Sequence, residues 1–177
     1  MPRLYRSGVG IHYEDCGRGP AILLTHGYRA TSQMWAKQVA DFQSDYRVIT
    51  WDLRGHGRSD SPEEVSDYSE SVAVGDMEAI LHACRVESAV IGGLSLGGYL
   101  SLAFHLVHPE RVRALMLFDT GPGYKNPKGR ELWNRAAERM ACEFETQGLS
   151  VLGGGAEVRI SKHRSAEGLA RAARGTL

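Results

Sequence analysis

The sequence predicts an α/β fold with a mostly parallel sheet, helices on both faces and an N-terminal hairpin. Short apolar runs alternate with stretches of helical periodicity between residues 21 and 119. This alternation is typical of parallel strands that are joined by crossover helices. Before residue 21, two stretches that mix polar and apolar residues flank a glycine turn, which indicates a pair of antiparallel strands.

The predicted strands are short apolar runs that end close to glycine. A continuous run without alternation, such as residues 21–24, is typical of a strand that is buried on both faces of a sheet. In chain order, we expect strands within residues 3–8, 11–17, 21–24, 46–55, 87–93 and 112–121.

The predicted helices carry apolar residues at intervals of three and four. Thr31 or Ser32 is expected to cap the first helix, because both side chains can accept a hydrogen bond from a free amide. In chain order, we expect helices within residues 34–42, 69–84, 96–109 and 130–148, followed by shorter helical pieces. The apolar side of the last long helix consists of Leu132, Trp133, Ala136, Ala137, Met140 and Phe144.

The charges balance, with 21 Lys and Arg against 21 Asp and Glu, so the net charge does not favour nucleic acid or an anionic membrane as a partner. No apolar stretch reaches the ~18–20 residues that span a bilayer, and the N-terminus lacks the apolar segment of a signal peptide. We therefore expect a cytoplasmic protein that binds neither nucleic acid nor a membrane. Cys16, Cys84 and Cys142 form no CxxC pair, so no disulfide framework, metal or cofactor is expected.

The stretch IGGLSLGGY, residues 91–99, places Ser95 among glycines between a predicted strand and a predicted helix. A sharp strand-to-helix turn of this kind lifts one side chain above the carboxyl edge of a parallel sheet, as in a nucleophile elbow. Glycines two residues before and two residues after the serine leave room for the crowded backbone. Amide groups at the start of the following helix can stabilise negative charge that develops nearby.

Two other interpretations of these glycines are open. One is a glycine-rich turn with an incidental serine. The other is a loop that binds a dinucleotide phosphate, but GGLSLGG does not match G-x-G-x-x-G, and GHGRSD ends in Asp60 where the third glycine belongs. The strand–turn–helix context favours the nucleophile elbow over both.

Three segments, residues 23–35, 48–60 and 89–120, resemble the α/β-hydrolase superfamily in their motifs, order and spacing. The motif GLSLGG is similar to the elbows of enol-lactonase-like and carboxylesterase-like members. The resemblance implies that residues 1–120 are the N-terminal part of the core domain and that residues 121–177 form a helical, cap-like segment.

The resemblance also implies roles for individual residues. Ser95 matches the catalytic nucleophile, and the backbone amides of Tyr28 and Leu96 match the oxyanion hole. Asp119 stands where some members carry the catalytic acid, although it is equally a candidate for a solvated loop residue. Members that attack epoxides or alkyl halides have an aspartate at the elbow. A serine favours an acyl-enzyme route, with a small-molecule ester, lactone or related acyl compound as the substrate.

The superfamily order places an acid and then a histidine after the serine, and no histidine here matches that position. His26 and His56 lie in motifs that shape loops, whereas His105 and His108 fall in the helix after the elbow. His163 lies in the cap-like segment and remains an unassigned alternative for the base.

The last strands of the fold are not found, so we expect an incomplete chain that is inactive by itself. Residues 112–118 then form an uncovered sheet edge, through which we expect self-association. The alternative function is a non-catalytic module that binds small molecules on the same fold.

Overall fold

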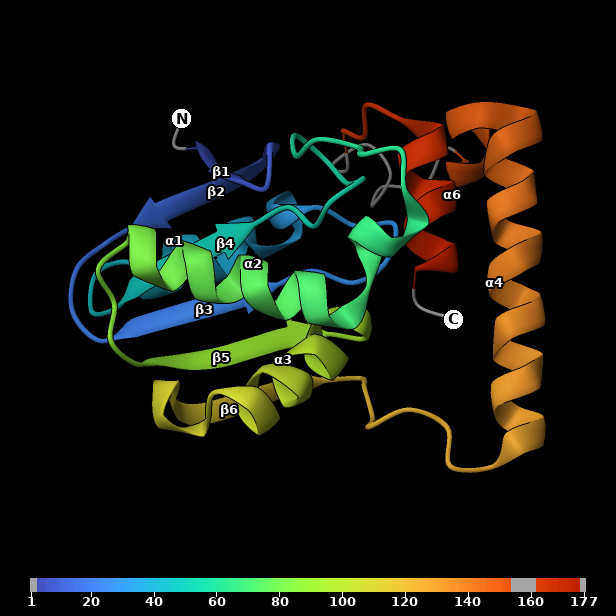
Figure 1. Cartoon of the computed structure of the whole chain (residues 1–177). Helices are drawn as coiled ribbons and strands as arrows, with labels where there is room; N and C mark the ends of the chain where they lie inside the picture. The colour runs from blue at the N-terminus through green and yellow to red at the C-terminus, as the bar shows by residue number, and fades with distance from the viewer. Residues whose placement is uncertain (1–2, 154–161, 176–177) are drawn as a thin grey trace.

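The computed structural model describes residues 3–153 and 162–175 and contains a six-stranded sheet. The strands are β1 (Arg3–Arg6), β2 (Val9–Cys16), β3 (Ala21–Thr25), β4 (Arg47–Trp51), β5 (Ala89–Leu94) and β6 (Val112–Phe118). Their order is β1-β2-β4-β3-β5-β6 (Figure 1). β2 pairs antiparallel with β1 and β4, and all other pairs are parallel. The mostly parallel sheet and the hairpin predicted from the sequence are confirmed.

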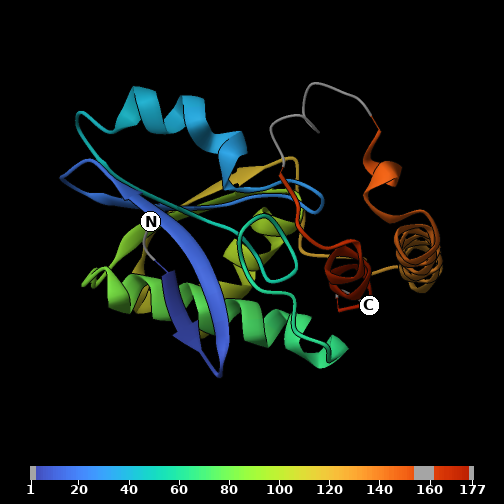
Figure 2. The same cartoon turned by 90° about the horizontal axis from the view of Figure 1, so that it is seen from above.

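Helices cover both faces of the sheet. The α-helices are α1 (Ala36–Phe42), α2 (Glu70–Ala83), α3 (Leu96–Val107), α4 (Pro127–Gln147) and α6 (Ala166–Arg174). Seen from above, α1 lies on one face, and α2 and α3 lie on the other (Figure 2). α4 and α6 lie beyond the carboxyl ends of the parallel strands (Figure 1). None of these described helices is long and apolar enough to cross a bilayer.

The main hydrophobic core lies between the sheet and the α2–α3 layer. Leu23 on β3, Ile49 on β4 and Ile91 on β5 are fully buried in it. Ile22, at an alternate position of β3, belongs to a second cluster with Trp35. Every residue of β3 is buried because both faces of this central strand are covered, as the apolar run predicts.

The first predicted helix begins differently from the expectation. Ser32–Trp35 form a 3₁₀ turn, and the α-helix begins only at Ala36. Thr31 occupies the N-cap position, but its side chain makes no capping hydrogen bond. The carboxylate of Asp52 accepts a hydrogen bond from the Ser32 amide at 2.7 Å and takes the place of a local cap.

The long helix α4 buries only part of its predicted apolar side. Of that side, Phe144 is buried in a cluster shared with α6 and Met140 packs against this cluster, whereas Leu132 and Trp133 are 67% and 43% exposed. The reason is the length of the partner helix, because α6 has 9 residues and α4 has 21. The N-terminal half of α4 therefore has no described helix to pack against.

β6 lies at an edge of the sheet and pairs only with β5 among the described strands. Leu117 and Phe118 are 42% and 38% exposed, although the strand is apolar. Such an edge presents unpaired backbone groups and apolar side chains to solvent. The uncovered edge expected from the sequence is confirmed for the described residues, and self-association through it stays a prediction.

Candidate active site

Ser95 lies in the turn between β5 and α3, with its side chain exposed. Its backbone has a φ of 50° and a ψ of −113°, a conformation that costs a non-glycine residue about 1–3 kcal/mol. Neighbours hold it in place. The Ser95 amide donates to the Phe118 carbonyl at 2.9 Å, and the Thr120 hydroxyl donates to the Ser95 carbonyl at 2.7 Å. The chain thus exposes one hydroxyl at a strained strand-to-helix turn.

Three glycines of this turn lie where no larger residue fits. A Cβ at Gly97 would lie 2.2 Å from the carbonyl oxygen of Thr25, and one at Gly93 would lie 2.3 Å from the carbonyl carbon of Gly97. A Cβ at Gly98 would lie 2.5 Å from Cγ2 of Thr120. The turn is therefore too crowded for side chains at these positions, which explains the glycine spacing around the serine.

The loop of residues 27–30, here called the Tyr28 loop, lies against Ser95. A Cβ at Gly27 would lie 3.7 Å from the Cβ of Ser95, which is ordinary van der Waals contact. Among the described residues, neither the Tyr28 amide nor the Leu96 amide donates to a protein acceptor. Leu96 is the first residue of α3, so its N–H is one of the amides that a helix leaves free.

Asp119 lies between Phe118 and Thr120, the two residues that bond the backbone of Ser95. Its side chain is exposed and its φ is 43°. The end of β6 is thus held next to the serine, where the resemblance expects an acid. The acid role of Asp119 stays a prediction.

His26 and His56 are buried, and their ring nitrogens are bound to the backbone. Nδ1–H of His26 donates to the Gly27 carbonyl at 2.7 Å, and Nε2 accepts from the Leu53 amide at 3.0 Å. In the same manner, Nδ1–H of His56 donates to a backbone carbonyl at 3.0 Å, and its Nε2 accepts from a backbone amide at 3.3 Å. A carbonyl only accepts and an amide only donates, so both rings are neutral with the proton on Nδ1. Neither ring is free to take a proton from Ser95.

The histidines that follow in the sequence do not reach the serine either. Nε2–H of His163 donates to the Arg29 carbonyl at 2.9 Å, and its Nδ1 accepts from the Gly57 amide at 3.3 Å. His105 and His108 lie at the C-terminal end of α3, opposite the end that carries the serine. Of the seven histidines, none hydrogen-bonds to the serine in the part of the chain that the structure describes.

Burial lowers the pKa of His26 and His163 below the ordinary value of 6.5, and it lowers the pKa of His56 well below that value. Histidines of this kind take up protons when the chain unfolds, so acid favours the unfolded state. Their stabilisation is complete above pH 6.5 and is lost as the pH falls through the lowered folded-state pKa values. We expect the free energy of unfolding in urea to fall below pH 6.5 by up to about 1.4 kcal/mol per pH unit for each histidine.

The matched variants are His56→Gln and His82→Gln. The first removes a buried histidine and should make the pH dependence of the free energy of unfolding shallower, whereas the second changes an exposed histidine and is the control. A free energy of unfolding that stays constant from about pH 8 to about pH 5 would contradict the neutral, buried state of these rings.

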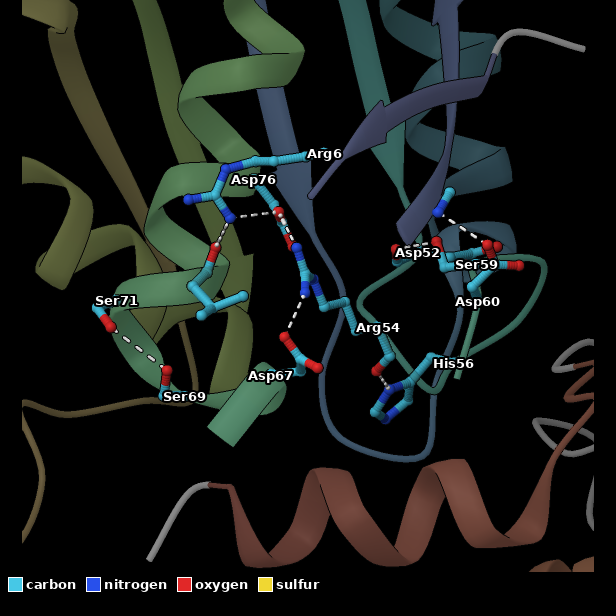
Figure 3. Close-up of polar contacts among 12 residues, drawn as sticks. Arg6, Asp52, Arg54, His56, Ser59, Asp60, Asp67, Ser69, Ser71 and Asp76 are labelled. Atoms are coloured by element: carbon cyan, nitrogen blue, oxygen red, sulfur yellow. Dashed lines mark hydrogen bonds and ion pairs between the residues drawn. The ribbon is translucent and has the colours of Figure 1, made fainter. Parts of the chain in front are cut away.

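A buried ion-pair cluster ties the loop after β4 to α2 (Figure 3). The guanidinium of Arg54 donates to the two carboxylate oxygens of Asp76 at 2.7 and 3.0 Å and to Asp67 at 3.2 Å. Arg6 on β1 donates to Asp76 at 3.0 Å. The side chains of Arg54 and Asp76 are 4% and 1% exposed, so the pair is part of the interior that supports the site.

A cavity of about 420 Å³ opens between the N-terminal ends of α2 and α3 and the C-terminal end of α6. This volume lies within the range of about 300–1,000 Å³ that is typical of small-molecule pockets. Leu96 and Tyr99 line the cavity on α3, and Ala172 lines it on α6. Ser95 is not among the lining residues, so the cavity adjoins the turn without containing the hydroxyl.

Comparison with known proteins places the chain in a family. A family model described as the alpha/beta hydrolase fold matches residues 20–157. The chain is 36% identical over 125 residues to bifunctional epoxide hydrolase 2 of Sus scrofa, a match that covers 70% of this chain and 22% of the relative. It is 36% identical over 110 residues to an epoxide hydrolase of Caballeronia sordidicola, covering 62% of this chain and 33% of the relative.

The fold agrees with these matches. A thermophilic esterase from Thermogutta terrifontis superposes with a TM-score of 0.84 at 25% identity, over 99% of this chain and 72% of that one. The chain belongs to the α/β-hydrolase family, as its motifs and sheet order indicate. It spans a third or less of the length of the two epoxide hydrolases.

Proposed function

We propose that the chain carries the nucleophile and the oxyanion-binding amides of a serine hydrolase that acts on esters, lactones or related acyl compounds. One observation carries the proposal. Ser95 is exposed in a strained strand-to-helix turn, beside the Tyr28 loop and two amides that donate to no described residue. Membership in the α/β-hydrolase family and the likeness to an esterase support it.

In this proposal, Oγ of Ser95 attacks the acyl carbonyl carbon while the hydroxyl proton passes to a base. The carbonyl oxygen becomes an oxyanion that accepts hydrogen bonds from the Tyr28 and Leu96 amides, and one such donor contributes about 2.7–4 kcal/mol to transition-state stability. The leaving group departs with a proton, and water then releases the acid from Oγ. Asp119 is proposed to orient the base. Because none of the described histidines hydrogen-bonds to the serine, Ser95 of this chain by itself should be acylated slowly.

Epoxide opening is the reaction named for two relatives. The side chain at position 95 argues against it here. An aspartate nucleophile forms an ester, which water can cleave at the carbonyl. Attack by Ser95 on an epoxide would form an ether, which has no carbonyl and would not turn over. A serine at this turn therefore favours acyl substrates, which give a cleavable ester on Oγ.

Labelling with an alkyl fluorophosphonate tests the proposal. We expect a slowly formed adduct on Ser95, because no described histidine is in place as the base, located by peptide mass spectrometry after long exposure to excess reagent and absent from the Ser95→Ala variant. Ser71 is also exposed and provides an internal control, since it lies outside the turn and should stay unmodified. No adduct on Ser95 in a chain with native circular dichroism would contradict the proposal.

A non-catalytic module that binds small molecules is the second candidate. Two observations favour it: none of the described histidines hydrogen-bonds to Ser95, and a cavity lies beside Leu96. Calorimetric binding of small acids or lactones, without turnover and without an adduct on Ser95, would support it. Ester turnover that disappears in Ser95→Ala would remove it.

A further inference from the structure

We propose that His163 is a positioning residue, which holds the Tyr28 loop in the conformation from which its amide binds an oxyanion. This inference rests on the proposed function, because it deepens the role given to that loop. His163 lies just before α6 and 134 residues from Arg29, its partner in the loop. It acts through the backbone of the loop and does not contact the reacting atoms.

His163 joins two loops through its two ring nitrogens. Nε2–H donates to the Arg29 carbonyl at 2.9 Å, and Nδ1 accepts from the Gly57 amide at 3.3 Å. The ring also packs edge-on against His56, with ring centroids 5.6 Å apart. Burial lowers the pKa of His163, so the ring keeps a single proton, which lies on the nitrogen that faces the carbonyl.

Arg29 is the residue of the loop that most needs support. Its φ is 66°, in the left-handed region that non-glycine residues seldom adopt. Its amide donates to Nε2 of His56 at 3.3 Å, so imidazoles hold both its N–H and its carbonyl. Relaxation of φ at this residue would rotate the peptide group that joins it to Tyr28. The two histidines therefore stabilise the backbone next to the proposed oxyanion donor.

The side chain of Tyr28 is held by the same C-terminal segment. Its hydroxyl donates to the Leu169 carbonyl on α6 at 2.8 Å, and its ring stands edge-on to His56 with centroids 5.5 Å apart. Burial raises the pKa of the Tyr28 hydroxyl, so it stays protonated and remains a donor. Residues 163–169 thus hold two consecutive residues of the loop from one side.

Two substitutions separate the two hydrogen bonds of His163. In His163→Gln, the side-chain amide nitrogen replaces Nε2 and can still donate to the Arg29 carbonyl. In His163→Asn, the shorter side chain places its oxygen near the position of Nδ1 and keeps only the bond from Gly57. Lys162→Asn changes the exposed neighbouring residue and is the matched control.

Two measurements report on these variants. Amide hydrogen exchange at residues 29 and 30 follows the loop, and the rate of fluorophosphonate labelling follows the reactivity of Ser95. We expect His163→Asn to raise the exchange and slow the labelling about fivefold, the effect of losing one hydrogen bond of ordinary net strength. The slower labelling should come from a lower rate of bond formation to Ser95 and not from weaker binding of the reagent. His163→Gln should restore both rates, and Lys162→Asn should change neither.

Unchanged exchange in His163→Asn would overturn the proposal. Exchange that rises as much in His163→Gln as in His163→Asn would also overturn it, because the Arg29 bond would then not hold the loop. A rise in exchange with unchanged labelling would also overturn it. If the exchange responds as expected but the parent chain is not labelled at Ser95, the proposed function fails, and the conclusion that His163 holds the Tyr28 loop is kept. Should His163→Asn not fold, His163→Leu fills similar space and removes both hydrogen bonds of the ring, and exchange unchanged there overturns the proposal.

Discussion

Replacing Asp76 with alanine is expected to lower the free energy of unfolding by about 3–5 kcal/mol, because it leaves the buried guanidinium of Arg54 without its main partner. The two side chains are 1% and 4% exposed and are joined at 2.7 and 3.0 Å. Asp67, at 3.2 Å, remains as a weaker partner. Since Arg54 belongs to the loop that follows β4, removal of the Asp76 carboxylate should also make this loop, which supports the site, less rigid.

Urea unfolding, followed by tryptophan fluorescence, measures this effect. Glu131→Ala is the matched control, because it removes an acid from the exposed i,i+4 pair with Arg135. Pairs of this kind contribute about 0.3–0.5 kcal/mol. A loss in Asp76→Ala as small as that in the control would show that the buried pair does not stabilise the fold.

Gly97→Ala is expected to cost about 1–3 kcal/mol of stability, as overpacking of a crowded interior does, and to reduce labelling of Ser95. The added Cβ would lie 2.2 Å from the Thr25 carbonyl oxygen and 2.7 Å from the His26 carbonyl oxygen. Both are backbone atoms, so relief requires β3 and the start of α3 to separate. That movement would displace the serine from the Tyr28 loop.

Gly121→Ala is the control for this substitution, because no heavy atom other than those of Gly121 and its two chain neighbours lies within 4 Å of the position where its Cβ would stand. Its unfolding midpoint and its labelling should match those of the parent chain. Wild-type stability and wild-type labelling in Gly97→Ala would contradict the steric explanation of the glycine pattern.

The elements of the core were predictable because each leaves a local pattern. The apolar run at residues 21–24 predicts β3, which spans Ala21–Thr25. The place of Ser95 in a tight strand-to-helix turn was predictable for a similar reason, since the glycines that the turn requires are its neighbours in sequence. The sheet edge followed from the absence of a further apolar run in the sequence after β6.

The contacts that hold the site were not predictable, because they join residues that are distant in sequence. Arg54 and Asp76 are 22 residues apart, and Tyr28 and Leu169 are 141 residues apart. No periodicity or motif links such pairs. The exposure of Trp133 was missed for the same reason, since the extent of α6 decides which part of α4 is covered.

A crystal structure of the chain phosphonylated by a fluorophosphonate would test the role of Ser95 most directly. We predict a phosphorus atom bonded to Oγ of Ser95, with the phosphoryl oxygen about 2.7–3.1 Å from the amide nitrogens of Tyr28 and Leu96. A phosphoryl oxygen that points to solvent, or a phosphonate on another residue with Ser95 unmodified, would contradict the assignment of this turn as a nucleophile beside an oxyanion hole.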